Sequence, residues 1–338
     1  MPTTRTIFVP RELGKLKQEY FPRLDRFLAS SFPDLSRSQI KNFIISGSVL
    51  CNNNLVVKPS QKVATGDTIT ITIPDPVELS IEPENIPLDI MYQDDELAVI
   101  NKPAGMMVHP AGRIVSGTLV NALLFHLSDL SGINGVLKPG IVHRLDKGTS
   151  GIMLVAKNDH SHRHLAAQFE TRTIEKMYCA LVWGGFAERE GEITKSIARS
   201  TSDRKKMVSG IRGKESKTRY IISEEFEYLT LLDVYPKTGR THQIRSHLAS
   251  TGHPVFGDAL YRGRIRRLAN LTTSERTEAS RLLKLMPRQA LHAAEIGFIH
   301  PTTHEKLRFS APIPEDFANV LETLKEFSRK AAKPQRKK

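Results

Sequence analysis

Residues 140–157, GIVHRLDKGTSGIMLVAK, include the side chains whose types and spacing best suit chemistry. His143, Arg144, Asp146 and Lys147 form a charged cluster just before an apolar run. Nearby cations can keep the Asp146 carboxylate ionised at neutral pH, as a nucleophile or a general base must be. The alternative is a structural ion pair between Asp146 and Arg144, because most charged loops do no chemistry.

The elements around Asp146 indicate how it is positioned. Residues 152–155, IMLV, are typical of a buried strand. Residues 148–151, GTSG, allow a tight bend whose backbone can approach a ligand. Asp146 is therefore predicted on a loop that a rigid strand holds in place.

Several motifs along the chain resemble one enzyme family. HRLDKGTSG resembles the motif HRLDxxTSG of the RluA family of pseudouridine synthases, which isomerise uridine in structured RNA. Further signatures follow in order: INKPAGMMVHP from Ile100, GRTHQIRSHLASTGHPVFGDALY from Gly239 and LHA from Leu291. LKPGIVHRLDK is most similar to the RluD type, which acts on the large ribosomal subunit, although Gly148 stands where Asp or another polar residue is expected.

The resemblance implies a role for each site residue. The family's catalytic aspartate falls on Asp146. Tyr178, on a predicted strand EKMYCALVWG, is the ring that stacks on the target base, whereas on local features alone it is an ordinary strand aromatic. Arg245, on a predicted helix with Thr241 as N-cap, pairs with the aspartate and orients it, as a planar fixed cation can. Arg144 would fill the space that the base vacates.

No cofactor or metal is expected. The family detaches uracil from ribose, turns it and rejoins it through carbon 5 without either. His160 and His164 lie one helical turn apart, but no HExxH glutamate accompanies them. Cys51 and Cys179 show no paired spacing, and there is no Walker-type loop or GxGxxG.

Composition limits the class of partner. The chain has 338 residues, 39% of them hydrophobic, and a net charge of +13, which favours phosphate backbones or anionic membranes. There is no apolar run of about 18 residues that would span a membrane, and the N-terminus lacks the apolar core of a secretory signal. We expect a cytoplasmic monomer that binds RNA and no membrane.

Patterning divides the chain into five parts. We expect a flexible arm at 1–20, an RNA-binding domain at 21–75, a proline-rich acidic linker at 76–86, a catalytic domain at 87–328 and a basic tail at 329–338. Apolar residues at helical spacing, an Asn-rich hairpin turn and a strand with alternating Ile give residues 21–75 a resemblance to the S-four-type domain.

The second helix of that domain carries the predicted RNA contacts. Arg37, Lys41 and Asn42 line its polar side, and Arg23 precedes the first helix. Arg23, Arg37 and Lys41 are expected to contact phosphates, since Arg suits bidentate pairing with them. A solvated helix face is the alternative.

These observations predict an α+β protein. A small N-terminal α/β RNA-binding domain precedes a catalytic domain with a mixed, mostly antiparallel sheet flanked by helices, the pseudouridine synthase fold. The predicted cleft crosses the sheet at Asp146, Tyr178 and Arg245, and the predicted substrate is large-subunit (23S) ribosomal RNA. A non-catalytic ribosome-assembly protein and a hydrolase with an aspartate nucleophile are the rivals. The sequence does not identify the modified uridines or the role of the basic residues 261–289.

Overall fold

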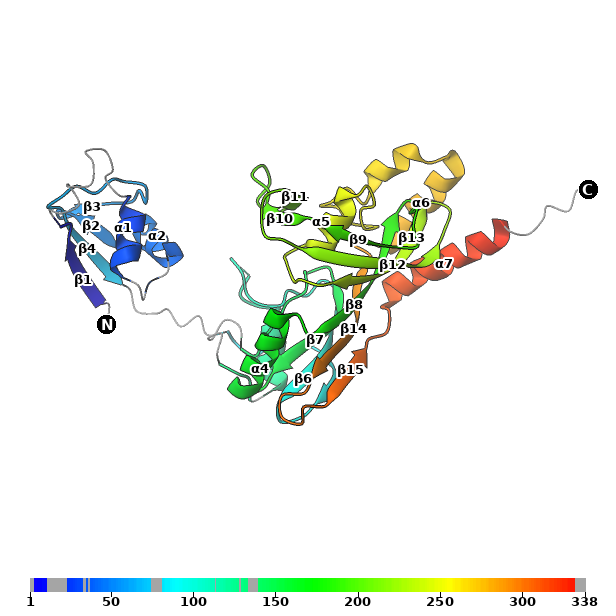
Figure 1. The fold of residues 1–338 in the computed structure, drawn as a ribbon, viewed down its shortest axis with the longest axis horizontal. Coiled ribbons are helices and arrows are strands. Elements are labelled where there is room, and N and C mark those ends of the chain that lie inside the picture. The colour runs from blue at the N-terminus through cyan, green and yellow to red at the C-terminus, as the bar shows by residue number, and fades with distance from the viewer. Residues whose placement is uncertain are drawn as a thin grey trace, which may run out of the picture. The chain divides into compact units, whose positions relative to one another are not determined.

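The computed structural model describes residues 3–10, 23–32, 35, 37–73, 81–112, 114–127, 129–132 and 139–331. The chain divides into two compact units, Met1–Leu79 and Ser80–Lys338 (Figure 1). Each unit has hydrophobic clusters of its own.

The N-terminal unit packs two helices on a small sheet. The four strands pair in the order β1-β4-β2-β3, and every pairing is antiparallel. Leu24, Leu28, Ile40 and Ile44 are fully buried, as the helical spacing of apolar residues predicts. The elements are β1 (Thr3–Phe8), α1 (Leu24–Ser31), α2 (Arg37–Ile45), β2 (Val49–Cys51), β3 (Asn54–Leu55) and β4 (Thr68–Ile73).

The prediction of a flexible arm at 1–20 is wrong for its first part. Residues Thr3–Phe8 form β1, which pairs with β4 from Thr3 opposite Ile73 to Phe8 opposite Thr68. Ile7 and Val9 pack on the core of the unit. This alternation of apolar residues is too short, among the polar residues around it, to predict a strand from the sequence. Residues 11–20 lie outside the described part of the chain.

The predicted linker, 76–86, is also too long. Residues 74–80 lie outside the described part, but Ile81 is buried and the Asn121 side chain donates a 2.9 Å hydrogen bond to the Glu82 carbonyl. The Glu84 carboxylate accepts from the Gly117 amide at 3.0 Å. These contacts tie the segment from Ile81 to the C-terminal unit, so its prolines reflect an extended chain that lies on that unit.

The C-terminal unit, Ser80–Lys338, is built on a nine-stranded sheet. Its order is β5-β6-β7-β14-β8-β13-β12-β9, with β15 also paired to β14. Only β7 and β14 pair in parallel, so the prediction of a mixed, mostly antiparallel sheet is confirmed. The strands are β5 (Asp89–Gln93), β6 (Leu97–Lys102), β7 (Ser150–Ala156), β8 (Glu175–Trp183), β9 (Glu190–Thr194), β12 (Lys217–Glu225), β13 (Leu229–Pro236), β14 (Leu291–Ile299) and β15 (Lys306–Ser310).

Helices and a separate two-stranded sheet accompany the large sheet (Figure 1). A hairpin of β10 (Ser196–Arg199) and β11 (Met207–Gly210) forms the small sheet. Of the helices, α4 packs on β7, α5 contacts β11, β12 and β13, and α6 packs on α7. The helices are α3 (Leu119–His126), α4 (Asp159–Thr171), α5 (Gln243–Ser250), the 3-10 helix η2 (Ile265–Asn270), α6 (Thr273–Leu285) and α7 (Glu315–Ala331).

Two helix ends are set as follows. The N-cap of α4 is Asn158, whose side chain accepts from the Ser161 amide, and Asp159 lies in the first turn of the helix. Helix α7 continues to Ala331 and takes up the first residues of the predicted tail at 329–338. Residues 332–338 lie outside the described part of the chain.

Candidate active site

The pairing of three strands brings Asp146 and Tyr178 together. Gly151, at the start of β7, lies opposite Ala293 of β14, and Ala293 lies opposite Tyr178 of β8. Asp146 lies on the loop that enters β7. The loop and the tyrosine are therefore one strand apart in space although 32 residues separate them in sequence.

Gly151 permits this parallel pairing. Its φ is +113°, and a Cβ built there would lie 2.2 Å from the Ala293 carbonyl oxygen. Any other residue would push β14 away from β7. The glycine of the TSG motif thus sets the spacing between the Asp146 loop and Tyr178.

The loop after Asp146 is held from several directions. Lys102 is fully buried, and its Nζ donates to the carbonyls of Pro103 at 2.7 Å, Met106 at 3.0 Å and Lys147 at 3.5 Å. Burial, aided by the charge of Arg288, lowers the pKa of Lys102 to about 7. Arg288 Nη1 donates to the Gly148 carbonyl at 3.0 Å.

These contacts explain two sequence features. The lysine of INKPAG supports the Asp146 loop from beneath and takes no place in the pocket lining. A Cβ at Gly148 would lie 2.5 Å from Oε1 of Gln289, so Gly148 and Gln289 fit each other in this chain.

Helix α5 carries Arg245 toward Asp146. The predicted N-cap Thr241 is wrong, because His242 caps the helix in the left-handed conformation with φ 52°. The Gln243 side chain fixes the start of the helix: it accepts from Thr238 Oγ1 at 2.6 Å and donates to Thr218 Oγ1 at 3.0 Å. Position 243 is thereby tied to β12.

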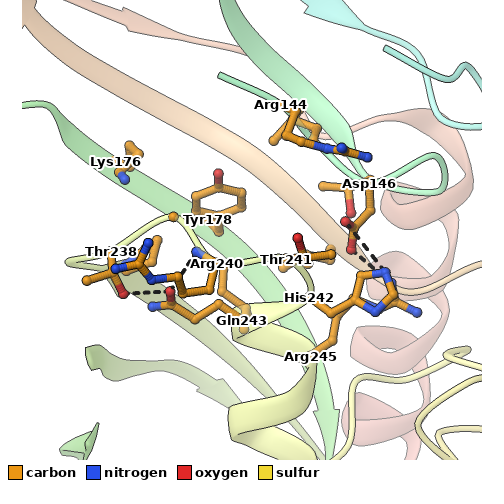
Figure 2. Close-up of a pocket in the computed structure, with 16 residues that line it drawn as sticks. Arg144, Asp146, Lys176, Tyr178, Thr238, Arg240, Thr241, His242, Gln243 and Arg245 are labelled. Carbon is orange, nitrogen blue, oxygen red and sulfur yellow. Dashed lines mark hydrogen bonds and ion pairs between the residues drawn. The ribbon is translucent and has the colours of Figure 1, made fainter. Parts of the chain in front are cut away.

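Arg245 bridges two carboxylates. Its Nη1 donates to Asp146 Oδ2 at 2.8 Å (Figure 2). Its Nε and Nη2 donate to the two oxygens of the buried Asp258 at 2.6 and 3.0 Å. Burial works to lower the pKa of Arg245, but the hydrogen bonds and charges of Asp258 and Asp146 outweigh it and raise the pKa. The guanidinium is thus a fixed cation aimed at Asp146.

Tyr261 and His242 complete the surroundings of this pair. The Tyr261 ring lies 5.1 Å from Cζ of Arg245, and its hydroxyl is 3.1 Å from Nδ1 of His242. The other ring nitrogen of His242, Nε2, lies 3.8 Å from Asp146 Oδ1. Burial lowers the pKa of His242, which favours the neutral ring beside Arg245.

Asp146, Tyr178 and Arg245 line one pocket together with Arg144, Lys176 and Arg240 (Figure 2). Burial, with the Asp146 charge as a second cause, raises the pKa of Tyr178, so its hydroxyl stays protonated at neutral pH. An aromatic face, one carboxylate and several cations suit a nucleotide whose base stacks and whose phosphates pair with Arg or Lys.

The structure assigns His143 elsewhere. Its Nε2 accepts the Leu154 amide at 2.9 Å, and its ring stacks on Phe169 of α4 with centroids 4.6 Å apart. Burial, with the Lys176 charge as a second cause, lowers the pKa of His143 to about 3. This side chain is a neutral structural group, and only Arg144 and Asp146 of the predicted charged cluster line the pocket.

The structure thus brings together the predicted residues of the catalytic unit. The ion-pair partner of Asp146 is Arg245 and not Arg144, whose side chain is exposed at the pocket. Asp258, Tyr261 and His242 were not singled out from the sequence. Asp258 and Tyr261 fall within the quoted GRTHQIRSHLASTGHPVFGDALY motif, but no periodicity links an aspartate to an arginine 13 residues earlier.

The RNA-contact residues predicted in the N-terminal unit lie on its own helices. Lys41 and Asn42 are exposed on α2, while Arg37 begins that helix. Arg23 pairs with the buried Asp25 through Nε at 2.9 Å and Nη2 at 3.2 Å. Arg23 therefore has an internal partner as well as a predicted RNA contact.

His160 and His164 stack on α4 with ring centroids 6.4 Å apart. Among the described residues, no group of three or more His, Cys, Asp or Glu side chains is arranged to hold a metal ion. None of the helices in the described ranges combines the length and the apolar character needed to cross a membrane.

Comparison with known proteins shows that this chain is an RNA-modifying isomerase. The family model for RNA pseudouridylate synthase matches residues 96–250, and the model for the S4 domain matches residues 22–69. The chain belongs to the RNA pseudouridine synthase family and converts uridine to pseudouridine in RNA.

Related proteins match over nearly their whole length. The chain is 45% identical to an uncharacterized RNA pseudouridine synthase of Aquifex aeolicus, over 90% of this chain and 95% of that protein. It is 43% identical to ribosomal large subunit pseudouridine synthase D of Zymomonas mobilis, over 94% and 98%. Among solved structures, human RNA pseudouridylate synthase domain containing 4 matches with a TM-score of 0.54 and 26% identity, over 70% of this chain and 93% of that one.

Proposed function

We propose that this protein isomerises specific uridines of large-subunit ribosomal RNA, with Asp146 as the catalytic carboxylate. One observation carries the assignment of the site: Asp146 is the carboxylate that lines the pocket, and Arg245 holds it at 2.8 Å beside Tyr178. The target is supported by relatives from Zymomonas mobilis and Vibrio vulnificus that are named ribosomal large subunit pseudouridine synthase D.

The site residues have separate roles in this proposal. Asp146 acts as nucleophile or general base on the nucleotide, and the ion pair with Arg245 fixes its direction. Tyr178 stacks on the base, because its ring faces the same pocket. Arg144, which is exposed at the pocket, occupies the space that the base vacates.

The reaction balances without a co-reactant. The bond from ribose C1′ to uracil N1 breaks, the uracil turns, and C1′ joins to C5. The proton on C5 is then lost, and N1 gains one. A uridine in folded RNA must leave its stack before this bond is reached, which calls for a stacking aromatic and surrounding cations.

The N-terminal unit is proposed to add affinity. Lys41 and Asn42 are exposed on α2 and so can reach phosphates, with Arg37 at the start of the same helix. We also propose a cytoplasmic monomer. Its exposed large apolar side chains, among the described residues, belong to many different elements of the chain.

Asp146→Asn tests the proposal. The change is nearly isosteric, so we expect unchanged folding and RNA affinity and loss of all but trace turnover. The matched control is Asp159→Asn on α4, whose carboxylate accepts from Ser131 and lies outside the pocket. Turnover is measured as tritium released from uridine labelled at C5 in a large-subunit RNA fragment.

The cellular target is tested separately. Ribosomal RNA from cells without the gene should lose pseudouridine at the target sites, and the wild-type gene but not Asp146→Asn should restore it. An unchanged pseudouridine map would show that large-subunit ribosomal RNA is not the target, and full activity of Asp146→Asn would show that Asp146 is not the catalytic carboxylate.

A further inference from the structure

A second basic concavity lies on the other side of α5 from the catalytic carboxylate. We call it the hairpin groove. One wall is β11 with Lys206 before it, and another is one side of α5. The third wall is formed by residues between Tyr261 and Asn270, which follow Asp258 in the chain. Lys206, Arg262, Arg266 and Arg267 are its charged residues.

The groove carries positive charge without compensation from its own lining. No Asp or Glu is among the described residues that line it. Arg262 and Arg266 are exposed, and no salt bridge between described residues includes either of them. Arg267 donates to the Gly252 carbonyl, which leaves its charge unneutralised. Such a surface attracts a polyanion.

The chain builds this surface from structured elements. Met207, at the start of β11, exchanges two hydrogen bonds with the Tyr261 hydroxyl: its amide donates at 2.9 Å and its carbonyl accepts at 3.0 Å. The Arg264 side chain donates to the carbonyls of Leu283 and Met286, which anchors the start of η2. The hairpin is therefore held beside α5, and η2 is held on α6 (Figure 1).

Helix α5 and Tyr261 separate the groove from the catalytic pocket. Arg245 reaches the pocket, whereas Ser246, Ala249 and Ser250 of the same helix line the groove. The Tyr261 ring has Arg245 Cζ at 5.1 Å and Lys206 Nζ at 5.2 Å, so it contacts one cation of each site. The two sites are about one helix diameter apart, roughly 10 Å.

We infer that the hairpin groove binds the phosphodiester backbone of the RNA that flanks the target uridine. This inference rests on the proposed function, because it takes the RNA in the groove to be continuous with the nucleotide at Asp146. Flanking phosphates gripped by Arg262 and Arg266 would hold the strand while its uridine leaves the stack. The basic segment after Tyr261 thus has a substrate-binding role.

The test removes two cations from the groove of the full chain. The double variant Arg262→Gln, Arg266→Gln is compared with Arg281→Gln, Lys284→Gln on α6, where both side chains are exposed and neither lines the groove. Both pairs lower the net charge equally. Affinity for a substrate stem-loop RNA is measured by fluorescence anisotropy across a salt titration.

The groove variant should bind about tenfold more weakly, and its plot of log Kd against log salt should be shallower by about 1.5 to 2, since each neutralised phosphate contributes about 0.9. Its kcat/KM should fall by the same factor, because KM rises while kcat stays unchanged. The α6 control should change affinity by less than about twofold. Equal effects in both pairs would overturn the inference, because only the net charge would then matter.

The RNA itself supplies a second discriminator. An RNA trimmed to the nucleotides next to the target should bind the wild type and the groove variant equally well, because it no longer reaches the groove. If the trimmed RNA still separates the two proteins, Arg262 and Arg266 act at the pocket and the inference is wrong. Failure of the proposed function is distinct: there the wild type itself releases no tritium from the full stem-loop.

Discussion

Asp258 offers a sharp test of how the site is assembled, because it contacts the Asp146 carboxylate only through Arg245. It is buried, and it accepts from Arg245 Nε and Nη2 and from the amides of Leu260 and Tyr261. Asp258→Asn keeps the shape of the side chain but removes its charge. The introduced amide nitrogen would then face a nitrogen donor of Arg245, with which it cannot form a hydrogen bond. Arg245 would lose its bidentate support while keeping the bond to Asp146.

The magnitude follows from these contacts. Breaking a buried ion pair costs about 3 to 5 kcal/mol, and the low end applies because Asp146 still pairs with Arg245. We therefore expect the free energy of unfolding to fall by about 3 kcal/mol. A guanidinium displaced by about 1 Å costs roughly a hundredfold in kcat, whereas KM for RNA should stay within about twofold because a buried Asp258 cannot touch RNA.

The matched control is Asp94→Asn, far from the pocket lining. Asp94 also accepts four hydrogen bonds, from Tyr92, the amides of Glu96 and Leu97, and His300. Urea unfolding should show a loss of stability in both variants, and single-turnover tritium release should show a loss of kcat only in Asp258→Asn. If Asp258→Asn is destabilised yet keeps kcat within about threefold of wild type, Asp258 does not orient the catalytic site.

Two further predictions concern other parts of the chain. The half-buried His143, with its pKa lowered to about 3 from 6.5, binds a proton more readily when unfolded. The contribution of His143 to the free energy of unfolding should therefore be constant above pH 6.5, and below pH 6.5 it should fall by up to about 1.4 kcal/mol per pH unit. Urea unfolding at a series of pH values should show a shallower fall for His143→Gln than for wild type, whereas the exposed His126→Gln should match wild type. Equal slopes for His143→Gln and wild type would contradict the assignment. A chain starting at Ser80 should fold, bind RNA more weakly and show a flatter salt dependence by anisotropy, and unchanged binding across the titration would give the N-terminal unit another purpose.

The local elements around the site could be predicted from the sequence. The apolar run after the Asp146 loop predicts β7, alternation around Tyr178 predicts β8, and helical periodicity through Ile244 and Leu248 predicts α5. These features follow from side-chain order along one stretch of chain, which hydrophobic periodicity reports directly. The motifs also identified Asp146, Tyr178 and Arg245, and the described geometry places them in one pocket.

Local pattern failed where long-range contacts decide the structure. The first residues of the chain are typical of a flexible arm because the stretch is polar and its apolar pattern is short. Only pairing with β4 makes Thr3–Phe8 a strand. The sequence from Ile81 is typical of a linker because its prolines break periodicity. Only the hydrogen bonds that Glu82 and Glu84 accept from Asn121 and Gly117 show that it lies on the C-terminal unit. Thr241 is a good N-cap by type, yet His242 caps the helix because Gln243 is tied to β12.

By itself, the sequence predicted the candidate site residues and determined the strands and the helix that carry them. Only the tertiary structure decided that Asp146 pairs with Arg245 instead of the neighbouring Arg144, that Asp258 clamps the arginine from behind, and that His143 turns away as a neutral packing group. The physical reason is that ion pairing and burial depend on distances through space. Those distances are set by strand register and helix packing, which no spacing along the chain specifies.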